Sequence, residues 1–284
     1  MSEPTRNNST IYTSSFTSWQ ESVPHLLDAS GLPDRLAAEK KILIKPNLVE
    51  PRKPPITTPV ELVEVLVDYI QTSQPHLEII IGEGCGSSSN NTLQIFETLG
   101  YSKLADRTGV TLLDLNEASL VHMQDSNCKR WPEMYLPSIV FESFLISVPV
   151  LKAHSLAGVT LTMKNMMGCA PPEHYGGLVW KKSKFHKNLH RSIFELNLYR
   201  TPDLTIIDGS VGLARYHLGG PKCKPPVRKL VGGFDPVAVD SYGAGLLCLD
   251  WRKIKHIALA HSVLGNGEAQ PVNSLDAKHN EQVA

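Results

Sequence analysis

The sequence lacks the features that define several protein classes. It has no Cys-x-x-Cys pair and its five cysteines are far apart, so it encodes neither a structural zinc motif nor a self-contained iron–sulfur motif. No apolar run approaches the roughly 20 residues that span a bilayer, and the start lacks the apolar segment of a signal peptide. The 28 basic residues equal the 28 acidic ones, so no net charge points to nucleic acid or a membrane surface as a partner. These absences predict a soluble, cytoplasmic protein with reduced thiols.

The 284 residues do include enough apolar side chains, 42%, to build a sizeable core. Short apolar runs, which predict buried strands, alternate with segments of helical spacing. The predicted strands are 41–45, 77–81, 110–115, 139–151 and 204–207, and the predicted helices are 59–71, 92–99, 155–167, 189–199, 236–247 and 251–264. This order predicts an α/β fold with a doubly wound, mostly parallel sheet, built either as one body or as two lobes with the site between them.

Composition along the chain predicts one α/β domain between two polar ends. Residues 1–39 are expected to form a tail and short helices, with the first 18 residues frayed, and residues 266–284 a polar tail. The domain itself covers 40–265. Within it, residues 118–135 lack periodicity and predict a surface excursion, so a boundary between lobes would fall near 116–137.

The stretch from Ser147 to Ala170 holds the densest group of candidate functional residues. A buried strand is expected to end near Pro149, and Lys152 and His154 follow it directly. The predicted helix after them carries Lys164 and Asn165. Ligands of open α/β sheets bind beyond the carboxyl ends of the strands. Two lysines and a histidine there predict proton transfer, anion binding or covalent amine chemistry, and the alternative is a helix start flanked by solvated cations.

Other predicted strands also end in polar residues. Lys45 and Asn47 follow the first strand, Glu83 follows the second, and Asp208 follows the strand at 204–207. In a parallel sheet these ends meet at one edge, so the side chains are expected to converge on the same site as Lys152 and His154.

Two further segments near predicted helices could serve the site. Gly84 and Gly86 lie in a Gly/Ser-rich turn between a strand and a helix, which can bind an anion through backbone N–H groups or can be simply a tight turn. Asp235, placed before a proline, predicts a helix N-cap. Asp240 lies five residues later among apolar neighbours, so it is expected to pair with a buried cation or to line the site.

Histidines near the segment 168–187 form a candidate metal site. This segment is rich in Pro, Gly and Lys and predicts a loop or lid. His186 and His190 are four residues apart, the separation that puts two imidazoles on one helical face, and His174 could be a third ligand. The alternative is a set of solvated histidines beside lysines.

Six motifs, in order, resemble those of the bacterial and archaeal domain-of-unknown-function family 362. They lie at 43–47, 57–70, 79–84, 148–168, 202–209 and 232–247. On this resemblance the chain is identified as a member of that family over about residues 40–260. Many members carry an appended ferredoxin module and are labelled iron–sulfur proteins, but this chain has no cluster motif of that kind.

The stretch from His154 to Gly158, followed by Lys164, is also similar to a stretch of the nickel-dependent lactate racemases. The resemblance implies a two-lobed α/β fold, an acid/base role for His154 on the substrate's α-proton, and a role for Lys164 in holding a nucleotide-type cofactor. The metal-binding histidine of that family has no direct counterpart, because Trp180 stands at about its place. His174, His186 or His190 would have to replace it.

These observations predict an enzyme that acts on a small carboxylate- or phosphate-bearing anion by racemase- or isomerase-like acid/base chemistry. The anion or a nucleotide-type cofactor would be bound with the help of Lys45, Lys152 and the glycine turn, and a transition metal is the other cofactor that these residues leave open. One alternative is a redox or iron–sulfur protein that works with a ferredoxin-type partner or through Cys85 and Cys169. Another is a non-catalytic anion-binding module, and a homo-oligomer is a further possibility for its assembly.

Overall fold

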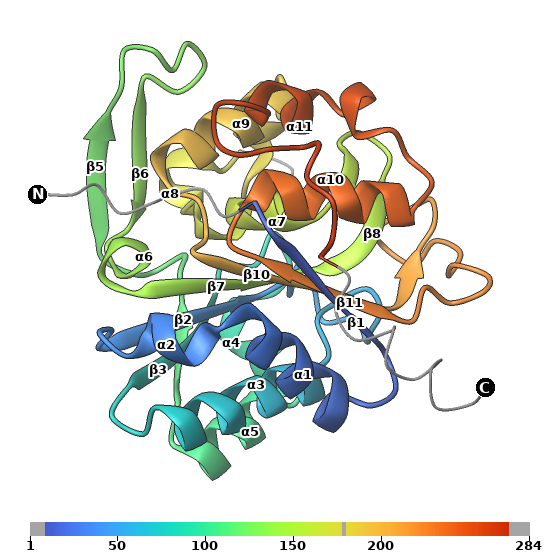
Figure 1. Cartoon of the computed structure of the whole chain (residues 1–284). Helices are drawn as coiled ribbons and strands as arrows, with labels where there is room; N and C mark the ends of the chain where they lie inside the picture. The colour runs from blue at the N-terminus through green and yellow to red at the C-terminus, as the bar shows by residue number, and fades with distance from the viewer. Residues whose placement is uncertain (1–8, 178–179, 273–284) are drawn as a thin grey trace, which may run out of the picture.

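A nine-stranded mixed sheet forms the middle of the molecule (Figure 1). The computed structural model describes residues 9–177 and 180–272. The strands are β1 (Ile11–Ser15), β2 (Lys41–Pro46), β3 (Glu78–Glu83), β4 (Thr111–Asp114), β7 (Phe144–Val148), β8 (Val150–His154), β9 (Gly158–Thr160), β10 (Leu204–Leu213) and β11 (Lys229–Gly233). The main path is β1-β11-β10-β7-β2-β3-β4, with β8 paired to β10 and β9 paired to β8. The pairs between β10 and β4 along this path are parallel, and β11 and β1 add antiparallel to one edge.

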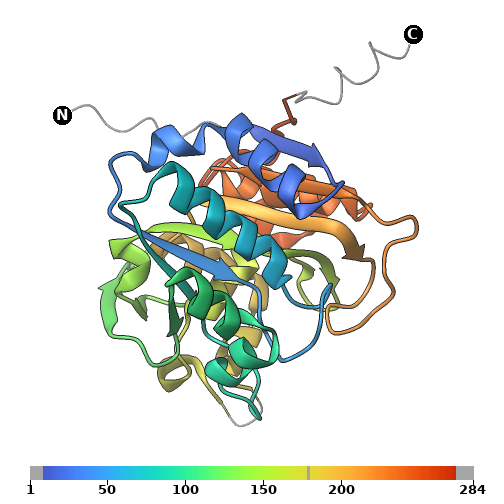
Figure 2. The same cartoon turned by 90° about the horizontal axis from the view of Figure 1, so that it is seen from below.

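Helices cover both faces of the sheet, as a doubly wound fold requires. On one face lie α1 (Trp19–Ser30), α2 (Leu32–Leu36), α3 (Val60–Ser73), α4 (Thr92–Thr98) and α5 (Tyr101–Thr108), seen in front of the strands in Figure 2. The other face carries α7 (Thr162–Asn165), η1 (Met166–Cys169), α9 (Leu189–Tyr199), α10 (Pro236–Leu246) and α11 (Lys255–Ala260). Each face has its own apolar core. The predicted α/β fold with a mostly parallel sheet is therefore confirmed, and the antiparallel strands β11 and β1 make the sheet a mixed one.

The start of α10 follows the sequence prediction for Asp235. Its carboxylate accepts the backbone N–H groups of Val237 and Ala238 at 2.8 and 3.0 Å, and Pro236 occupies the first turn. The N-cap thus satisfies two amides that have no partner inside the helix. Asp240 is placed one turn further along, fully buried.

The single strand predicted at 139–151 is wrong. A short helix, α6 (Ile139–Glu142), precedes β7, and Pro149 separates β7 from β8. Proline has no N–H to donate to a ladder, so the strand is interrupted there, while its carbonyl still accepts the N–H of Asp208 at 2.9 Å. Lys152 and His154 consequently lie within β8 and not after the strand.

The helix predicted at 155–167 is also wrong. The chain turns back at Gly158, whose φ of 76° suits glycine, and β9 pairs antiparallel with β8. Of the apolar residues behind that prediction, Val159 lies in β9, Leu161 directly follows it, and Met163 lies in the short helix α7. Only α7, a single turn, is helical before the 3₁₀ turn η1.

Three other segments differ from prediction. The expected excursion at 118–135 contains a two-stranded hairpin, β5 (Leu120–Gln124) and β6 (Glu133–Pro137), which stands off the body in Figure 1. The expected frayed start contains β1, paired with β11. The last predicted helix is divided into η3 (Trp251–Lys253) and α11. Of the predicted terminal tails, residues 1–8 and 273–284 lie outside the described residues.

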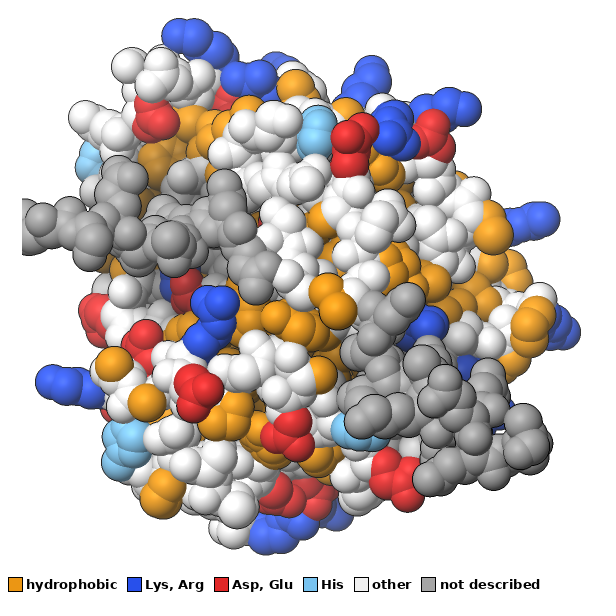
Figure 3. Space-filling view, viewed as in Figure 1, with side chains coloured by type: hydrophobic (Ala, Val, Ile, Leu, Met, Phe, Trp, Pro, Cys, Tyr) orange, Lys and Arg blue, Asp and Glu red, His pale blue; other side chains and the backbone are white. Residues whose placement is uncertain are grey.

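The described surface is mixed in character. On the face in Figure 3, basic and acidic side chains are interspersed among apolar and neutral ones. Among the described residues, no helix combines the length and apolar character needed to cross a bilayer.

Candidate functional site

A cavity of about 300 Å³ opens beyond the carboxyl ends of β2 and β3 and beside β8. Ten of the residues predicted for the site line it, namely Lys45, Asn47, Glu83, Gly84, Gly86, Lys152, His154, Lys164, Asn165 and His186. The convergence follows from the parallel pairing of β7, β2 and β3, which places the ends of these strands along one edge.

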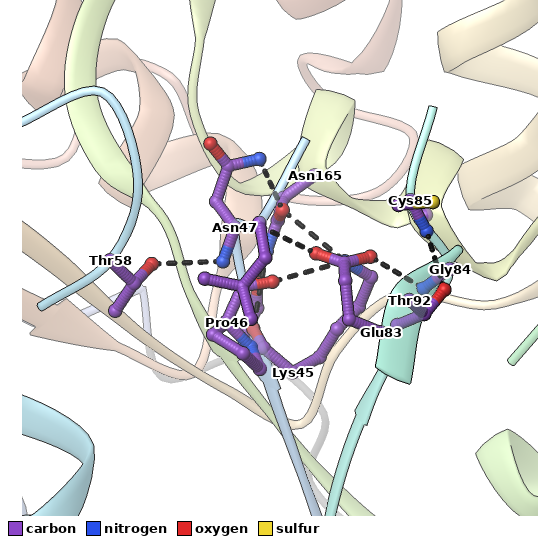
Figure 4. A network of polar contacts seen from close by, with 12 residues as sticks. Lys45, Pro46, Asn47, Thr58, Glu83, Gly84, Cys85, Thr92 and Asn165 are labelled. Atoms are coloured by element: carbon purple, nitrogen blue, oxygen red, sulfur yellow. Dashed lines mark hydrogen bonds and ion pairs between the residues drawn. The ribbon is translucent and has the colours of Figure 1, made fainter. Parts of the chain in front are cut away.

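The floor of the cavity holds a buried ion pair between β2 and β3 (Figure 4). Lys45 Nζ lies 2.8 Å from Glu83 Oε1, and the two side chains are 0% and 3% exposed. Glu83 also accepts the backbone N–H groups of Leu48 and Gly84, at 3.0 and 2.8 Å. These partners compensate both buried charges, so the pair adds no net charge to the cavity.

Two asparagines connect this pair to Lys152. Asn165 Oδ1 accepts from Lys45 Nζ at 3.3 Å and from Asn47 Nδ2 at 3.0 Å (Figure 4). Asn47 Oδ1 in turn accepts from Lys152 Nζ at 2.5 Å, and the carbonyl of Ile56 accepts from the same amine at 2.6 Å. Burial, together with the nearby ammonium of Lys164, lowers the pKa of Lys152 to about 7. Lys152 is therefore poised to gain or lose a proton near neutral pH.

Lys182 is a site residue that the sequence reasoning did not single out. Its ammonium reaches into the cavity wall and donates to Asn116 Oδ1 at 2.7 Å, to the carbonyl of Gly168 at 3.1 Å and to the carbonyl of Ala170. Burial lowers its pKa to about 8. In the sequence it sits in a run of lysines that looks like an ordinary solvated surface, so no local signal separates it from its neighbours.

Lys164 is a cavity lysine whose ammonium is not paired by any described residue. Asp240 holds the start of α7 by accepting the N–H groups of Thr162 and Met163 at 2.8 and 3.0 Å, and Lys164 follows on the same turn. Burial lowers the pKa of Lys164 to about 8. In the part of the chain that the structure describes, its ammonium has no hydrogen-bond or ion-pair partner. Lys164 is thus available to a ligand in the cavity.

Three histidines line the cavity, and their environment keeps them neutral. His154 and His217 stack with ring centroids 3.9 Å apart. Burial is the main cause that lowers the pKa of both, to about 3 for His217 and further for His154, and the Lys164 ammonium adds to it. Burial also lowers the pKa of His186. His217 comes from the long connection after β10, where the sequence offers no motif that would identify it.

The glycine turn contributes to the wall but its first amides are already used. Gly84 N–H donates to Glu83, and Cys85 N–H donates to Thr92 Oγ1 at 3.2 Å. A Cβ on Gly84 would collide with the carbonyl of Gly168, so this glycine permits close packing of the turn against η1. The two amides of Gly84 and Cys85 are therefore not open to a ligand.

The remaining predicted residues do not line the cavity. Asp208 is buried within β10 and accepts the N–H of Ser210 at 2.9 Å. Asp240 fixes α7 as described, and no lysine of the described residues pairs with it. Cys85 and Cys169 are both buried and neither belongs to the cavity lining.

The predicted metal trio is not brought together. His174, on α8 (Pro172–Tyr175), stacks on Tyr135 of β6 at 3.8 Å, and Tyr135 stacks on His122 of β5 at 4.3 Å. His190 Nδ1 lies 3.0 Å from Nδ1 of the buried His256. The four-residue spacing of His186 and His190 fails because Asn188, with a φ of 64°, separates η2 (Ser183–His186) from α9.

The described residues contain no group of three or more His, Cys, Asp or Glu side chains that could hold a metal ion. Trp180, at the place where the resemblance puts a metal ligand, is half-exposed at the cavity mouth with its ring 4.9 Å from that of His186. This donor set does not fit a nickel centre.

Comparisons with known proteins identify the family of this chain. The family model described as Domain of unknown function (DUF362) matches residues 42–245. The chain belongs to this family. A thylakoid-associated protein from Synechocystis sp. is 25% identical over 238 residues, which cover 80% of this chain and 69% of that protein.

Among solved structures, the lactate racemase apoprotein from Thermoanaerobacterium thermosaccharolyticum has a similar fold. The TM-score is 0.53 at 15% sequence identity, and the match covers 86% of this chain. The chain spans only 58% of the racemase. The expected lactate-racemase-like fold is therefore confirmed for this DUF362 protein. At 15% sequence identity the similarity concerns the fold alone.

Proposed function

We propose that this protein is an enzyme that binds a small carboxylate- or phosphate-bearing molecule and moves a proton on it, as a racemase or isomerase does. The observation that carries the proposal is Lys164, a partly buried ammonium with no partner among the described residues, in a cavity lined by three neutral histidines. An ammonium in this setting needs an anion, and neutral imidazoles beside it can exchange protons.

The charges around the cavity favour an anionic ligand. Four lysines and one glutamate line it, and the Lys45–Glu83 pair cancels itself. No carboxylate of the described residues pairs with Lys152, Lys164 or Lys182, and the first and last of these are held by neutral oxygens. A ligand with one or two negative charges would compensate this surplus.

The pKa values of the cavity lysines favour proton transfer over anion binding alone. Lys152 and Lys164 have pKa values of about 7 and 8, and general acid/base groups work best when their pKa lies near the working pH. An anion-binding module would have no need of amines that lose their charge near neutrality. Half-exposed Trp180 and Tyr216 at the mouth suit a ligand with an apolar or planar part beside its anionic group.

Hydrogen–deuterium exchange tests this function directly. The full chain is incubated in D₂O with a panel of 2-hydroxy, 2-amino and 2-oxo carboxylates and sugar phosphates, and deuterium at carbon is measured by mass spectrometry. We expect incorporation into at least one class of compound and its loss in Lys164→Met. Lys103→Met, which changes an exposed lysine on α5, is the matched control.

Two outcomes would contradict the proposal. Equal incorporation by the wild type and Lys164→Met would remove Lys164 from the site. Saturable binding of an anion with no incorporation into any bound compound would make the protein a binding module.

A further inference from the structure

His154 accepts hydrogen bonds from the backbone in a way that fixes its protonation. The N–H groups of Leu156 and Ala157 both lie 3.1 Å from His154 Nδ1. Backbone N–H groups only donate, so Nδ1 must carry a lone pair and no proton. The neutral ring then carries its proton on Nε2, for which the described part of the chain offers no partner.

This arrangement prevents His154 from serving as a base. A neutral imidazole accepts a proton only on its unprotonated nitrogen, which here is occupied by two amides at the turn between β8 and β9. Cationic Lys164 and stacked His217 oppose a positive charge on the ring as well. What the ring can offer a ligand is the Nε2–H group, as a hydrogen-bond donor.

His186 has the opposite arrangement. Its Nδ1 lies 3.3 Å from the carbonyl oxygen of Lys182, and a carbonyl only accepts, so Nδ1 carries the proton. Nε2 of the neutral ring is then the unprotonated nitrogen, and the contacts of the described residues leave it without a partner. His186 lines the same cavity as His154.

We propose that the two histidines have separate tasks: His154 donates an Nε2–H hydrogen bond to an oxygen of the substrate, and His186 takes the proton through Nε2. This inference rests on the proposed function. It differs from the role that resemblance to lactate racemases implies for His154, which is proton transfer by that residue itself.

The step balances without a further reactant. The C–H bond next to the carboxylate or carbonyl breaks, its proton goes to His186 Nε2, and its electron pair moves onto the substrate oxygen as an enolate. The Nε2–H of His154 and the ammonium of Lys164 stabilise that oxygen. A neutral imidazole held in one tautomer is suited to this, because its donor is fixed before charge develops. Return of the proton to carbon restores both histidines.

The first test is a tautomer measurement on the chain without any ligand. Long-range ¹H–¹⁵N correlation spectra of ¹⁵N-histidine-labelled protein at pH 7.5 distinguish protonated from unprotonated ring nitrogens. His154→Gln and His186→Gln variants assign the two signals. We expect an unprotonated Nδ1 in His154 and an unprotonated Nε2 in His186. The reverse pattern in either ring would overturn the inference, whatever the chain does with substrate.

The second test separates donor from base in the deuterium-exchange assay. Gln can replace an Nε2–H donor but cannot replace a base, so His154→Gln is expected to retain at least tenfold more exchange than His154→Ala. His186→Gln is expected to lose about 10²- to 10⁴-fold, the usual contribution of a general base, with ligand affinity changed less than fivefold. Exposed His25→Gln is the control.

Equal loss in His154→Gln and His154→Ala, or full exchange by His186→Gln, would contradict the division of tasks. Absence of exchange in the wild type would instead contradict the proposed function, and the spectra would still decide the tautomers.

Discussion

Lys164 differs from the other lysines of the cavity in having no hydrogen-bond or ion-pair partner among the described residues. Protein oxygens hold Lys45, Lys152 and Lys182, while the described residues offer no partner to the ammonium of Lys164. We expect Lys164→Met to weaken binding of a small carboxylate by about tenfold or more, because hydrogen bonds to charged groups contribute about 1.5–3 kcal/mol. Isothermal titration calorimetry at pH 6.5 measures this, with Lys103→Met as the control. Unchanged affinity would place the anion elsewhere.

The lowered pKa values of the cavity lysines predict how binding depends on pH. An anion favours the protonated amines, so it raises their pKa, and the complex takes up protons. Since the free values are about 7 for Lys152 and 8 for Lys164 and Lys182, affinity should fall as pH rises from 7 to 9. Titrations in buffers of different ionisation enthalpy report the proton uptake. Proton release on binding would contradict the predicted rise of the lysine pKa values.

The residues of the site differ in how far the sequence reveals them. His154 and Lys164 could be predicted because they follow an apolar run closely and match a motif. Lys182 and His217 could not, because each reaches the cavity from a long connection whose path depends on tertiary contacts. The role of His154 is likewise hidden from the sequence, since the two amides that occupy Nδ1 depend on the turn at Gly158.

At the scale of elements, β2 and β3 are joined through their side chains as well as their ladder. Removal of one charge from the Lys45–Glu83 pair would leave the other buried without its partner. We expect Lys45→Met to lower the free energy of unfolding by about 3–5 kcal/mol, and the double variant Lys45→Met/Glu83→Gln to lose less. Urea unfolding followed by circular dichroism measures both. A double variant at least as unstable as Lys45→Met would mean that the unpaired carboxylate is not the cause.

The central elements were predictable because local and global signals agree in them. β2 and β3 are short, continuously buried runs, as central parallel strands are, and the buried residues of α3 recur at helical spacing. The errors lie where one residue changes the local geometry. Pro149 divides a single apolar run into two strands, and Gly158 turns the chain back on β8. β1 escaped prediction because its stability comes from pairing with β11, more than 200 residues away in sequence.

For the whole molecule, buried histidines predict sensitivity to acid. Burial lowers the pKa of His217 and His256 from 6.5 to about 3, so below pH 6.5 the unfolded chain binds protons that the folded chain does not. The free energy of unfolding should therefore fall as pH decreases below 6.5. The decrease is up to about 1.4 kcal/mol per pH unit for the fully buried His256, and smaller for the partly exposed His217 because solvent screens its charge.

His256→Phe isolates one of these contributions outside the cavity. Urea unfolding at pH 7, 6 and 5 should show a shallower decline for the variant than for the wild type. An equal decline of the free energy of unfolding in the wild type and His256→Phe would mean that His256 does not contribute to the acid sensitivity.

The ring stack of His122, Tyr135 and His174 connects the projecting hairpin to α8. Tyr175, next to His174, adds a second link by accepting the N–H of Tyr135 at 2.7 Å. The hairpin thus stands away from the cavity and still anchors α8. This helix precedes Trp180, Lys182 and His186, which line the cavity. Shortening the hairpin should loosen the entrance of the cavity and leave the Lys45–Glu83 pair intact. Access to the cavity and the chemistry inside it can therefore be varied separately.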